Sequence, residues 1–301
     1  YIRAAVHWRP RFRVQPVDRQ GVPRKHAATG ASGNGALPGV TAMNKLRVLD
    51  LFSGIGGFSL GLERTGGFKT VAFCEIEDFP RRVLAKHWPE VPQYDDVRKL
   101  TSARLAADGI AVDVITGGFP CQDISVAGKQ LGIGEDTRSG LWSECIRLVS
   151  ELRPKYALFE NVSNLLSGPS EQPGGWFSAI LADLARAGYD AEWADIPASY
   201  VGAPHRRDRI WIIAYPNEKR CEGQSAQPMV WQRHIEAQSL RSVAGWPGRS
   251  NLPASRFCNA DDGIPNRVVR LECAGNSVFP AIPELIGHAI LSSLQQSASG
   301  Q

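Results

Sequence analysis

The sequence predicts an α/β fold in which an open sheet of parallel strands carries helices on both faces. Short apolar runs, rich in β-branched residues, alternate with longer amphipathic segments of helical length. The first apolar run ends in a glycine turn from which a helix starts, as in nucleotide-binding βαβ units. The chain of 301 residues, 43% hydrophobic, is long enough for one large domain, or for one large domain with a small appendage.

The composition excludes several classes of protein. No apolar run approaches the length of a membrane span, and no apolar segment of a secretory signal follows the arginine-rich N-terminus. The six cysteines form no Cys-x-x-Cys pair, so we predict no metal site. Several of them lie in apolar or helical patterns, which favours a reducing compartment. We therefore expect a cytoplasmic protein with no membrane partner.

The N-terminal segment, residues 1–45, is predicted to be a disordered basic extension. Its first 42 residues carry seven basic side chains and one acid, without any sustained hydrophobic period. A basic tail of this kind adds non-specific affinity for nucleic acid. The chain opens on Tyr1, and Met43 stands just before the first strand, so we favour upstream or artefactual sequence over a functional tail.

The first βαβ unit predicts a nucleoside-binding turn. A strand over 46–52 leads into the glycine turn 53–57, and a helix follows from Phe58 to Arg64. The dinucleotide pattern G-x-G-x-x-G requires glycine where Ser59 stands, so the turn departs from the nicotinamide-binding form. The next strand, 69–74, ends in Glu75, about 20 residues after the turn, where an acid can bind ribose hydroxyls. The alternative for Glu75 is a solvated strand end.

A helix from Asp78 to His87 comes next, and a third strand is expected to end near Asp95, Asp96 and Val97. Asp96 is a candidate for contact with the amino group of an adenine. Two adjacent acids in a turn are as often simply solvated, and this alternative stays open.

Cys121 is the candidate nucleophile of the chain. The apolar run 112–116 predicts a buried strand that stops at Gly117, Gly118 and Pro120. Ligands and catalytic groups gather at the carboxyl ends of such strands, so Cys121 is placed like a nucleophile. The alternative is a small buried hydrophobic residue. The polar loop over 126–140 is long for a connection and predicts a binding loop.

A second ionisable group, Glu160, lies at the end of another strand. A helix over 141–152 precedes the short strand 156–159, which runs into Glu160. If the two strands are parallel, Glu160 and Cys121 share one edge of the sheet and face a common pocket.

The rest of the chain adds a basic turn and an irregular region. A helix over 175–187 and a strand over 189–196 precede the arginines at 206, 207 and 209, which lead into the strand 210–214. Three arginines beside a buried strand are suited to hold anions or a carboxylate. Residues 217–265 are irregular and mildly basic, which suits contacts with nucleic acid or, alternatively, a flexible surface insertion. A final helix is expected over 281–294.

Taken together, these residues resemble the DNA (cytosine-5)-methyltransferase family. The matching motifs occur in the order of that family and span most of the chain; they are Asp50–Gly57, Gly118–Gln122, Glu160–Val162, Arg206–Ile210 and Gly275–Val278. The resemblance implies a Rossmann-like domain for S-adenosyl-L-methionine over 46–216 and 266–301, with helices on both faces of its sheet. It also implies a short target-recognition region over 217–265, smaller than an independent domain usually is.

The resemblance assigns roles to particular residues. The positions that would line the methyl-donor site are Phe52, Ser53, Gly54, Gly56, Gly57, Glu75, Ile76, Asp96, Val97, Pro120, Leu141, Asn276, Ser277 and Val278. The catalytic set would be Cys121, Glu160, Arg207 and Arg209, and the residues near DNA would be Gln122, Ser125, Lys129 and Arg138. Residues 125–139 would form a segment that closes over the substrate.

The chemistry implied by this family explains the residue types. Cysteine attack at C6 of cytosine makes C5 nucleophilic toward a methyl sulfonium, and Glu160 stabilises charge at N3. Arg209 would hold Glu160 and the O2 atom of cytosine, and Arg207 a backbone phosphate. The base must leave the duplex for this reaction.

The resemblance implies a monomer that acts on double-stranded DNA in the cytoplasm of a bacterial or phage-infected cell. It would work either in a restriction–modification pair with a cognate endonuclease or as an orphan or phage methylase. The alternatives are an RNA cytosine-5 methyltransferase and a catalytically weak DNA-binding homologue. Ser59 disfavours a nicotinamide oxidoreductase.

Overall fold

The computed structural model describes residues 44–120, 140–168, 174–203, 205–217 and 275–299. The chain divides into two units, residues 1–42 and 43–301, and all the described residues lie in the second. Nearly all of the predicted N-terminal extension and target-recognition region, and the polar loop that follows Cys121, therefore lie outside the described residues.

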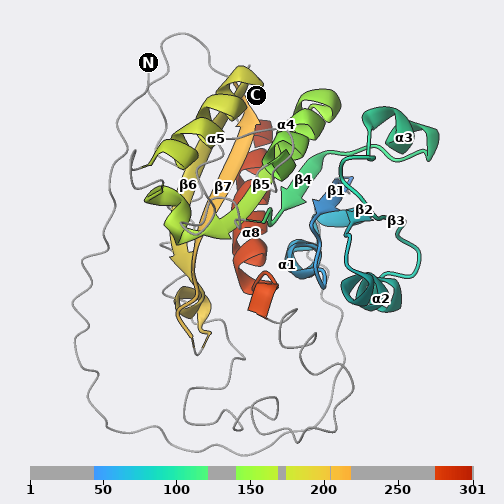
Figure 1. Cartoon of the computed structure of the whole chain (residues 1–301), viewed down its shortest axis with the longest axis horizontal. Coiled ribbons are helices and arrows are strands. Elements are labelled where there is room, and N and C mark those ends of the chain that lie inside the picture. Colours follow the sequence, from blue (N-terminus) through green and yellow to red (C-terminus); the bar gives the residue numbers. More distant parts are fainter. Residues whose placement is uncertain (1–43, 121–139, 169–173, 204, 218–274, 300–301) are drawn as a thin grey trace, which may run out of the picture. The chain divides into compact units, whose positions relative to one another are not determined.

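A seven-stranded sheet forms the centre of the described fold (Figure 1). Its strands are β1 (Leu46–Leu51), β2 (Phe68–Cys74), β3 (Gln93–Tyr94), β4 (Val114–Gly117), β5 (Tyr156–Val162), β6 (Tyr189–Pro197) and β7 (Asp208–Pro216). Their order across the sheet is β3-β2-β1-β4-β5-β7-β6. The first five strands run parallel, and β7 lies antiparallel to both β5 and β6. The predicted α/β class is confirmed.

The parallel strands bring several predicted site residues to one edge. The turn after β1, Glu75 after β2, the segment after β4 and Glu160 near the end of β5 all lie at carboxyl ends. β4 and β5 pair in parallel from Val114 opposite Tyr156 to Gly117 opposite Phe159. The condition for a shared edge is therefore met for Glu160 and for the segment that leads to Cys121.

The antiparallel strand β7 contributes its first residues to the same edge of the sheet. β6 and β7 are joined through the short 3-10 helix Ala198–Val201 and a turn, too short a connection for a parallel crossover. Because β7 runs against β5, its beginning lies beside the end of β5, with Arg209 opposite Val162. The arginine-rich turn thus reaches the carboxyl edge only because this strand is reversed, a feature that the sequence did not predict.

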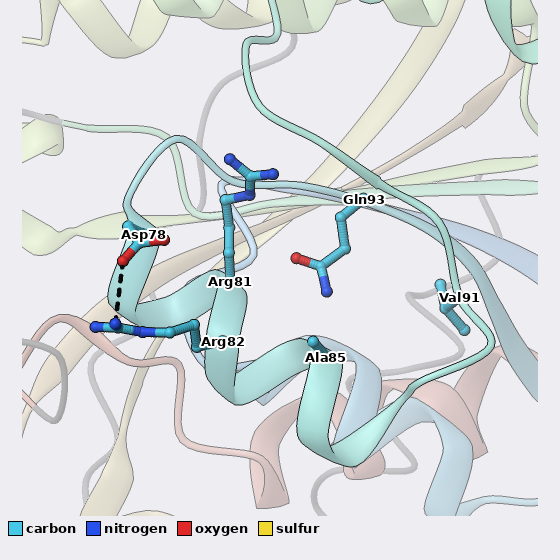
Figure 2. A pocket seen from close by; sticks show the side chains of 6 residues that line it. All are labelled: Asp78, Arg81, Arg82, Ala85, Val91 and Gln93. Carbon is cyan, nitrogen blue, oxygen red and sulfur yellow. Dashed lines mark ion pairs between the residues drawn. The ribbon is translucent and has the colours of Figure 1, made fainter.

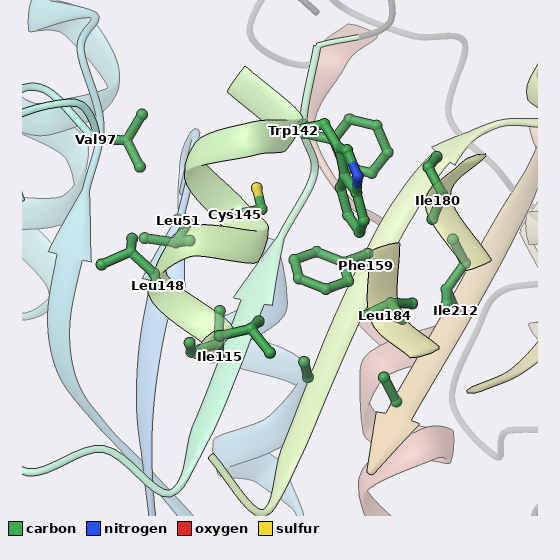
Figure 3. Close-up of a cluster of buried hydrophobic side chains, with 14 of the residues drawn as sticks. Leu51, Val97, Ile115, Trp142, Cys145, Leu148, Phe159, Ile180, Leu184 and Ile212 are labelled. Carbon is green, nitrogen blue, oxygen red and sulfur yellow. The ribbon is translucent and has the colours of Figure 1, made fainter. Parts of the chain in front are cut away.

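Helices cover both faces of the sheet, as predicted (Figure 1). On one face α1 (Gly57–Arg64) and α8 (Ala281–Ser299) pack against each other and against the inner strands. On the other face α4 (Gly140–Leu152) and α5 (Gly175–Arg186) enclose the second core cluster (Figure 3). Two further helices, α2 (Asp78–His87) and α3 (Ser102–Ala107), follow β2 and β3. The sequence did not predict α3, which is only six residues long.

An aromatic cluster fixes the backbone that leads to Cys121. Phe119 packs against Trp142 of α4 and Phe159 of β5, with ring centroids 5.1 and 6.3 Å away (Figure 3 shows the latter two). All three side chains are buried. The indole nitrogen of Trp142 donates to Asp183 of α5 at 2.8 Å, which locks the ring. Residue 119 is therefore held by the core only two positions before the predicted nucleophile.

A nearly buried carboxylate with two partly exposed basic partners holds the opposite edge of the sheet. Asp113, just before β4, accepts a hydrogen bond from Arg47 Nε at 2.7 Å. Its other carboxylate oxygen forms an ion pair with Lys155 Nζ at 3.1 Å. These contacts join the beginnings of three neighbouring strands. Although burial opposes ionisation, the hydrogen bonds from Arg47 and Lys155 lower the pKa of Asp113 to about 2.

Asp113→Asn is expected to lower the free energy of unfolding at pH 7 by about 1–2 kcal/mol, discounted because Arg47 and Lys155 are half exposed or more. The folded-state pKa lies below the unfolded value of 3.8, so the stabilisation is present above pH 4 and lost as pH falls toward 2. Urea titrations of both proteins at several pH values measure this. Asp78→Asn, which removes an exposed pair with Arg82, is the matched control and should change stability little. An undiminished difference between the Asp113 proteins at pH 2 would contradict the assignment.

Candidate active site

The turn after β1 has the backbone geometry of a ligand-binding loop. Phe52 adopts a φ of 49° and Gly54 one of 52°, in the left-handed region that costs a non-glycine residue energy. Gly56, at a φ of 85°, also approaches Trp88 so closely that a Cβ atom would lie 2.7 Å from its ring. The turn is thus strained at Phe52 and tolerates no side chain at Gly56.

Glu75 is bound directly to this turn. Its Oε2 accepts the backbone N–H of Gly54 at 2.7 Å, and its Oε1 accepts the N–H of Glu77 at 2.9 Å. Each carboxylate oxygen keeps a further lone pair for a hydroxyl donor. Next to it, Ile76 leaves 61% of its surface exposed at the carboxyl edge of the sheet. An acceptor beside an exposed apolar side chain suits a ribose and the base attached to it.

Asp96 and Val97 lie on the loop that follows β3. Asp96 Oδ1 accepts the backbone N–H of Arg98 at 3.0 Å and its Nε at 3.1 Å. Partial burial opposes ionisation, but these hydrogen bonds from Arg98 dominate and lower the pKa of Asp96. Asp96 is therefore a charged acceptor at neutral pH, the form that binds an exocyclic amine. Val97 is buried in the core beneath it.

Asp50 is a buried carboxyl group that sequence reasoning left without a role. Its two oxygens accept hydroxyl hydrogen bonds of 2.7 Å from Ser59 of α1 and Thr116 of β4. Burial raises the pKa of Asp50 to about 7, against these donors. Ser59 stands where a dinucleotide fingerprint has glycine, and its hydroxyl supplies a bond that glycine cannot. The departure from that fingerprint thus joins the glycine turn to the strand that leads to Cys121.

Glu160 and Arg209 form a largely buried pair at the end of β5. Arg209 Nε lies 3.0 Å from Glu160 Oε1, and the two side chains are 21% and 10% exposed. Burial raises the pKa of Glu160, although Arg209 and Arg207 oppose the shift. A Cβ atom on Gly118 would lie 3.4 Å from Glu160 Oε2 and 3.8 Å from Val278. Glycine at 118 therefore leaves one face of this carboxyl group uncovered by a side chain.

Asn161 connects this pair to the segment after β4. Its Nδ2 donates to the carbonyl of Phe119 at 3.0 Å, and the side chain is buried. Pro120, half-buried, comes next in the chain. Cys121 itself lies outside the described residues, as do Gln122, Ser125, Lys129 and Arg138. Their roles stay predictions.

The segment 275–278 is held between Arg207 and α1. Arg207, which has a φ of 40°, donates to the carbonyls of Gly275 and Ser277, the latter at 2.8 Å. On the other side, a Cβ atom on Gly57 would lie only 2.3 Å from the carbonyl oxygen of Val278. The missing side chain at Gly57 is what lets this segment approach the start of α1. In this structure the guanidinium of Arg207 donates hydrogen bonds to backbone carbonyls. Its contact with a DNA phosphate stays a prediction.

The structure thus gathers most of the described candidates along one edge. The residues joined by a hydrogen bond or an ion pair are Gly54 with Glu75, Glu160 with Arg209, and Arg207 with Ser277. A Cβ atom on Gly57 or Gly118 would lie within 3.8 Å of Val278. Leu141 is half-buried in the first turn of α4, and Asn276 is exposed beside Ser277. Ser53 donates to the carbonyl of Asp50 within the turn.

A separate hollow of about 430 Å³ opens beside α2 (Figure 2). It is lined by Asp78, Arg81, Arg82, Ala85, Val91 and Gln93, none of which is a candidate site residue. Within the described part of the chain, no group of three histidine, cysteine or acidic side chains is placed to hold a metal ion. None of the described helices is long and apolar enough to cross a membrane.

A sheet with five parallel strands, a glycine turn after β1, an acid after β2 and a buried Glu–Arg pair at the end of β5 place the chain in the Rossmann-like class of α/β proteins. Residues 46–251 match the model of the C-5 cytosine-specific DNA methylase family. The chain therefore belongs to this family, which confirms the resemblance of its motifs.

Individual relatives agree with this assignment. The chain is 35% identical over 187 residues to the type II methyltransferase M.Sau3AI of Staphylococcus aureus, over 58% of this chain and 45% of that protein. It is 32% identical over 193 residues to M.CviJI of a Chlorella virus, over 62% and 49%. These matches span less than half the length of each relative. A methyltransferase of Entamoeba histolytica shares the fold, with a TM-score of 0.56 at 16% identity over 84% of this chain and 99% of that one.

Proposed function

We propose that this chain transfers a methyl group from S-adenosyl-L-methionine to C5 of cytosine in duplex DNA. The observation that carries the proposal is the buried Glu160–Arg209 pair beside Gly118 and Val278. Membership of the cytosine-5 methylase family supports the reaction class. The relatives named above are type II methyltransferases, which supports a duplex DNA substrate and a restriction–modification context.

The described residues fit the methyl donor. The turn 53–57 is open at Gly54, where no atom lies within 4 Å of the position that a Cβ atom would take. Glu75 offers acceptors for ribose hydroxyls, and Ile76 offers apolar surface. Asp96 is charged and suited to an adenine amino group. When bound, the donor supplies an electrophilic methyl group on a sulfonium.

Cys121 and Glu160 carry the chemistry on the base in this proposal. The thiolate of Cys121 bonds to C6, and the electron pair of the C5–C6 double bond shifts toward N3 and C5. Glu160, whose raised pKa favours the protonated form, hydrogen-bonds or protonates N3 and so stabilises that charge. C5 would take the methyl group as its bond to the sulfonium sulfur breaks, which leaves S-adenosylhomocysteine. Transfer of the C5 proton to water and departure of Cys121 as a thiolate would then restore the aromatic ring.

The arginines orient these groups. Arg209 holds Glu160 in place and has further N–H groups for the O2 atom of cytosine. Arg207 fixes the segment 275–278 and is also the candidate for a backbone phosphate. The reaction needs a cytosine that has left the helix, because its C6 and N3 atoms are inaccessible inside a stacked duplex.

A methyl-transfer assay tests the proposal directly. Purified protein with tritiated S-adenosyl-L-methionine is expected to label duplex DNA, and bisulfite sequencing should find methylated cytosines at one short recurring sequence. A preference for transfer RNA would instead favour the RNA cytosine methyltransferase. DNA binding without any transfer would favour a catalytically weak homologue and contradict the proposal.

A further inference from the structure

Arg147 of α4 makes an unusually complete set of contacts for a side chain outside the candidate catalytic set. Its Nε and NH2 groups engage Glu144, at 2.7 and 2.6 Å, and NH1 lies 2.7 Å from Glu151. NH2 also donates to the carbonyls of Val97 and Leu100, at 3.1 and 2.7 Å. Two carboxylates on its own helix thus aim the guanidinium at two carbonyls of a different segment.

The segment it grips is the loop that carries Asp96. Within this loop the N–H groups of Lys99 and Leu100 donate to the carbonyls of Asp96 and Val97, forming a compact turn. Val97 and Leu100 are buried, whereas the Asp96 side chain is 20% exposed and its carboxylate is held by Arg98. The strand before the loop, β3, has only two residues and gives it little support. The turn is therefore positioned mainly by its buried side chains and by Arg147.

Glu151 provides a second link between α4 and this loop. While one of its oxygens pairs with Arg147, the other accepts the N–H of Ser102 at 2.9 Å, at the start of α3. Helix α4 thus fastens the loop on both sides of residues 98–101. Lysine at 147 would lose the planar fork that reaches two carboxylates and two carbonyls together.

We propose that Arg147 is a positioning residue for recognition of the adenine of the methyl donor, acting through the loop that carries Asp96. This inference rests on the proposed function, because it takes the donor to be an adenine nucleoside. The inference goes further than the proposed function, because it makes the preference for adenine over other bases depend on Arg147, a side chain that does not touch the ligand. If Arg147 only stabilised the fold, its loss would weaken all nucleosides alike.

The test compares two ligands on each protein. S-adenosylhomocysteine carries the adenine amino group, and its inosine analogue carries a carbonyl oxygen that the Asp96 carboxylate disfavours. Titration calorimetry should show that the full-length protein prefers the adenine form at least about tenfold. In Arg147→Ala this preference should fall about three- to tenfold. Arg147→Lys should keep an intermediate preference. Because the ratio is taken within one protein, partial unfolding cancels.

Arg186→Ala is the matched control. Arg186 pairs with Asp183 across one turn of α5, as Arg147 does with Glu144, but touches no residue of the loop. The Arg186→Ala protein should prefer the adenine form over the inosine form by the same ratio as the unmodified protein. An unchanged ratio in both Arg147 variants would overturn the inference and leave the proposed function standing. If the unmodified protein bound neither ligand, the proposed function would fail as well.

Discussion

Replacing Cys121 by serine is expected to reduce methyl transfer by at least about four orders of magnitude, below detection in a standard assay. A serine hydroxyl is almost fully protonated at neutral pH and is a far weaker nucleophile toward C6 than a thiolate. The residue before it, Pro120, follows Phe119, which is fixed by its aromatic neighbours and by Asn161. The substitution therefore removes a reactive atom two positions after a residue that the core holds in place. Incorporation of tritium into DNA measures methyl transfer, and a gel-shift assay on the same variant measures DNA binding. The two together separate a loss of chemistry from a loss of binding.

Cys145→Ala is the control for this substitution. Cys145 is buried in α4, and burial raises the pKa of its thiol far above neutrality, so it takes no part in nucleophilic chemistry. Its replacement should leave transfer within about threefold of the unmodified rate, since buried cysteine packs as a small hydrophobic residue. Full turnover in Cys121→Ser would remove the nucleophile from the account.

Glu160→Gln is expected to lower kcat by about 10²–10⁴ with little effect on DNA or donor affinity. Glutamine keeps the shape of the side chain but has no proton to give to N3. Burial raises the pKa of Glu160, which keeps a larger fraction of it protonated at a given pH than an exposed glutamate has. The kcat of the unmodified protein should therefore fall as pH rises through that raised pKa. The kcat of the glutamine variant should not show this decrease with rising pH.

Glu284→Gln is the comparison for Glu160→Gln. Glu284 pairs with Arg64 at 3.5 Å between α8 and α1, on a partly exposed surface. Its replacement should leave kcat and the pH profile unchanged, because it lies outside the candidate site. A kcat for Glu160→Gln within threefold of the unmodified protein would mean that Glu160 is not the group that acts at N3.

Much of the fold was predictable because its signals are local. Apolar runs and glycine or proline stops place β1, β4 and β5 within a few residues of their observed bounds, and α2 runs from Asp78 to His87 as expected. The contact between Glu160 and Arg209 was expected from the resemblance. Its geometric cause is the reversed direction of β7, which no local pattern reveals.

Other features depend on contacts between distant residues. The bonds from Ser59 and Thr116 to Asp50, and the grip of Arg147 on Val97 and Leu100, join elements far apart in the sequence. Asp50 stands inside a motif that the sequence made visible, yet neither its burial nor its partners could be deduced from it. The sequence signal for this network is Ser59, a hydroxyl residue at the position where the dinucleotide pattern requires glycine.

The most direct test of the account is covalent trapping. Duplex DNA that carries 5-fluorocytosine at the methylated position is incubated with the protein and S-adenosyl-L-methionine, because fluorine at C5 blocks the final elimination. The account predicts a denaturation-resistant complex whose tryptic mass spectrum places the modified nucleotide on Cys121. No adduct from a protein that methylates ordinary DNA, or an adduct on another residue, would contradict it.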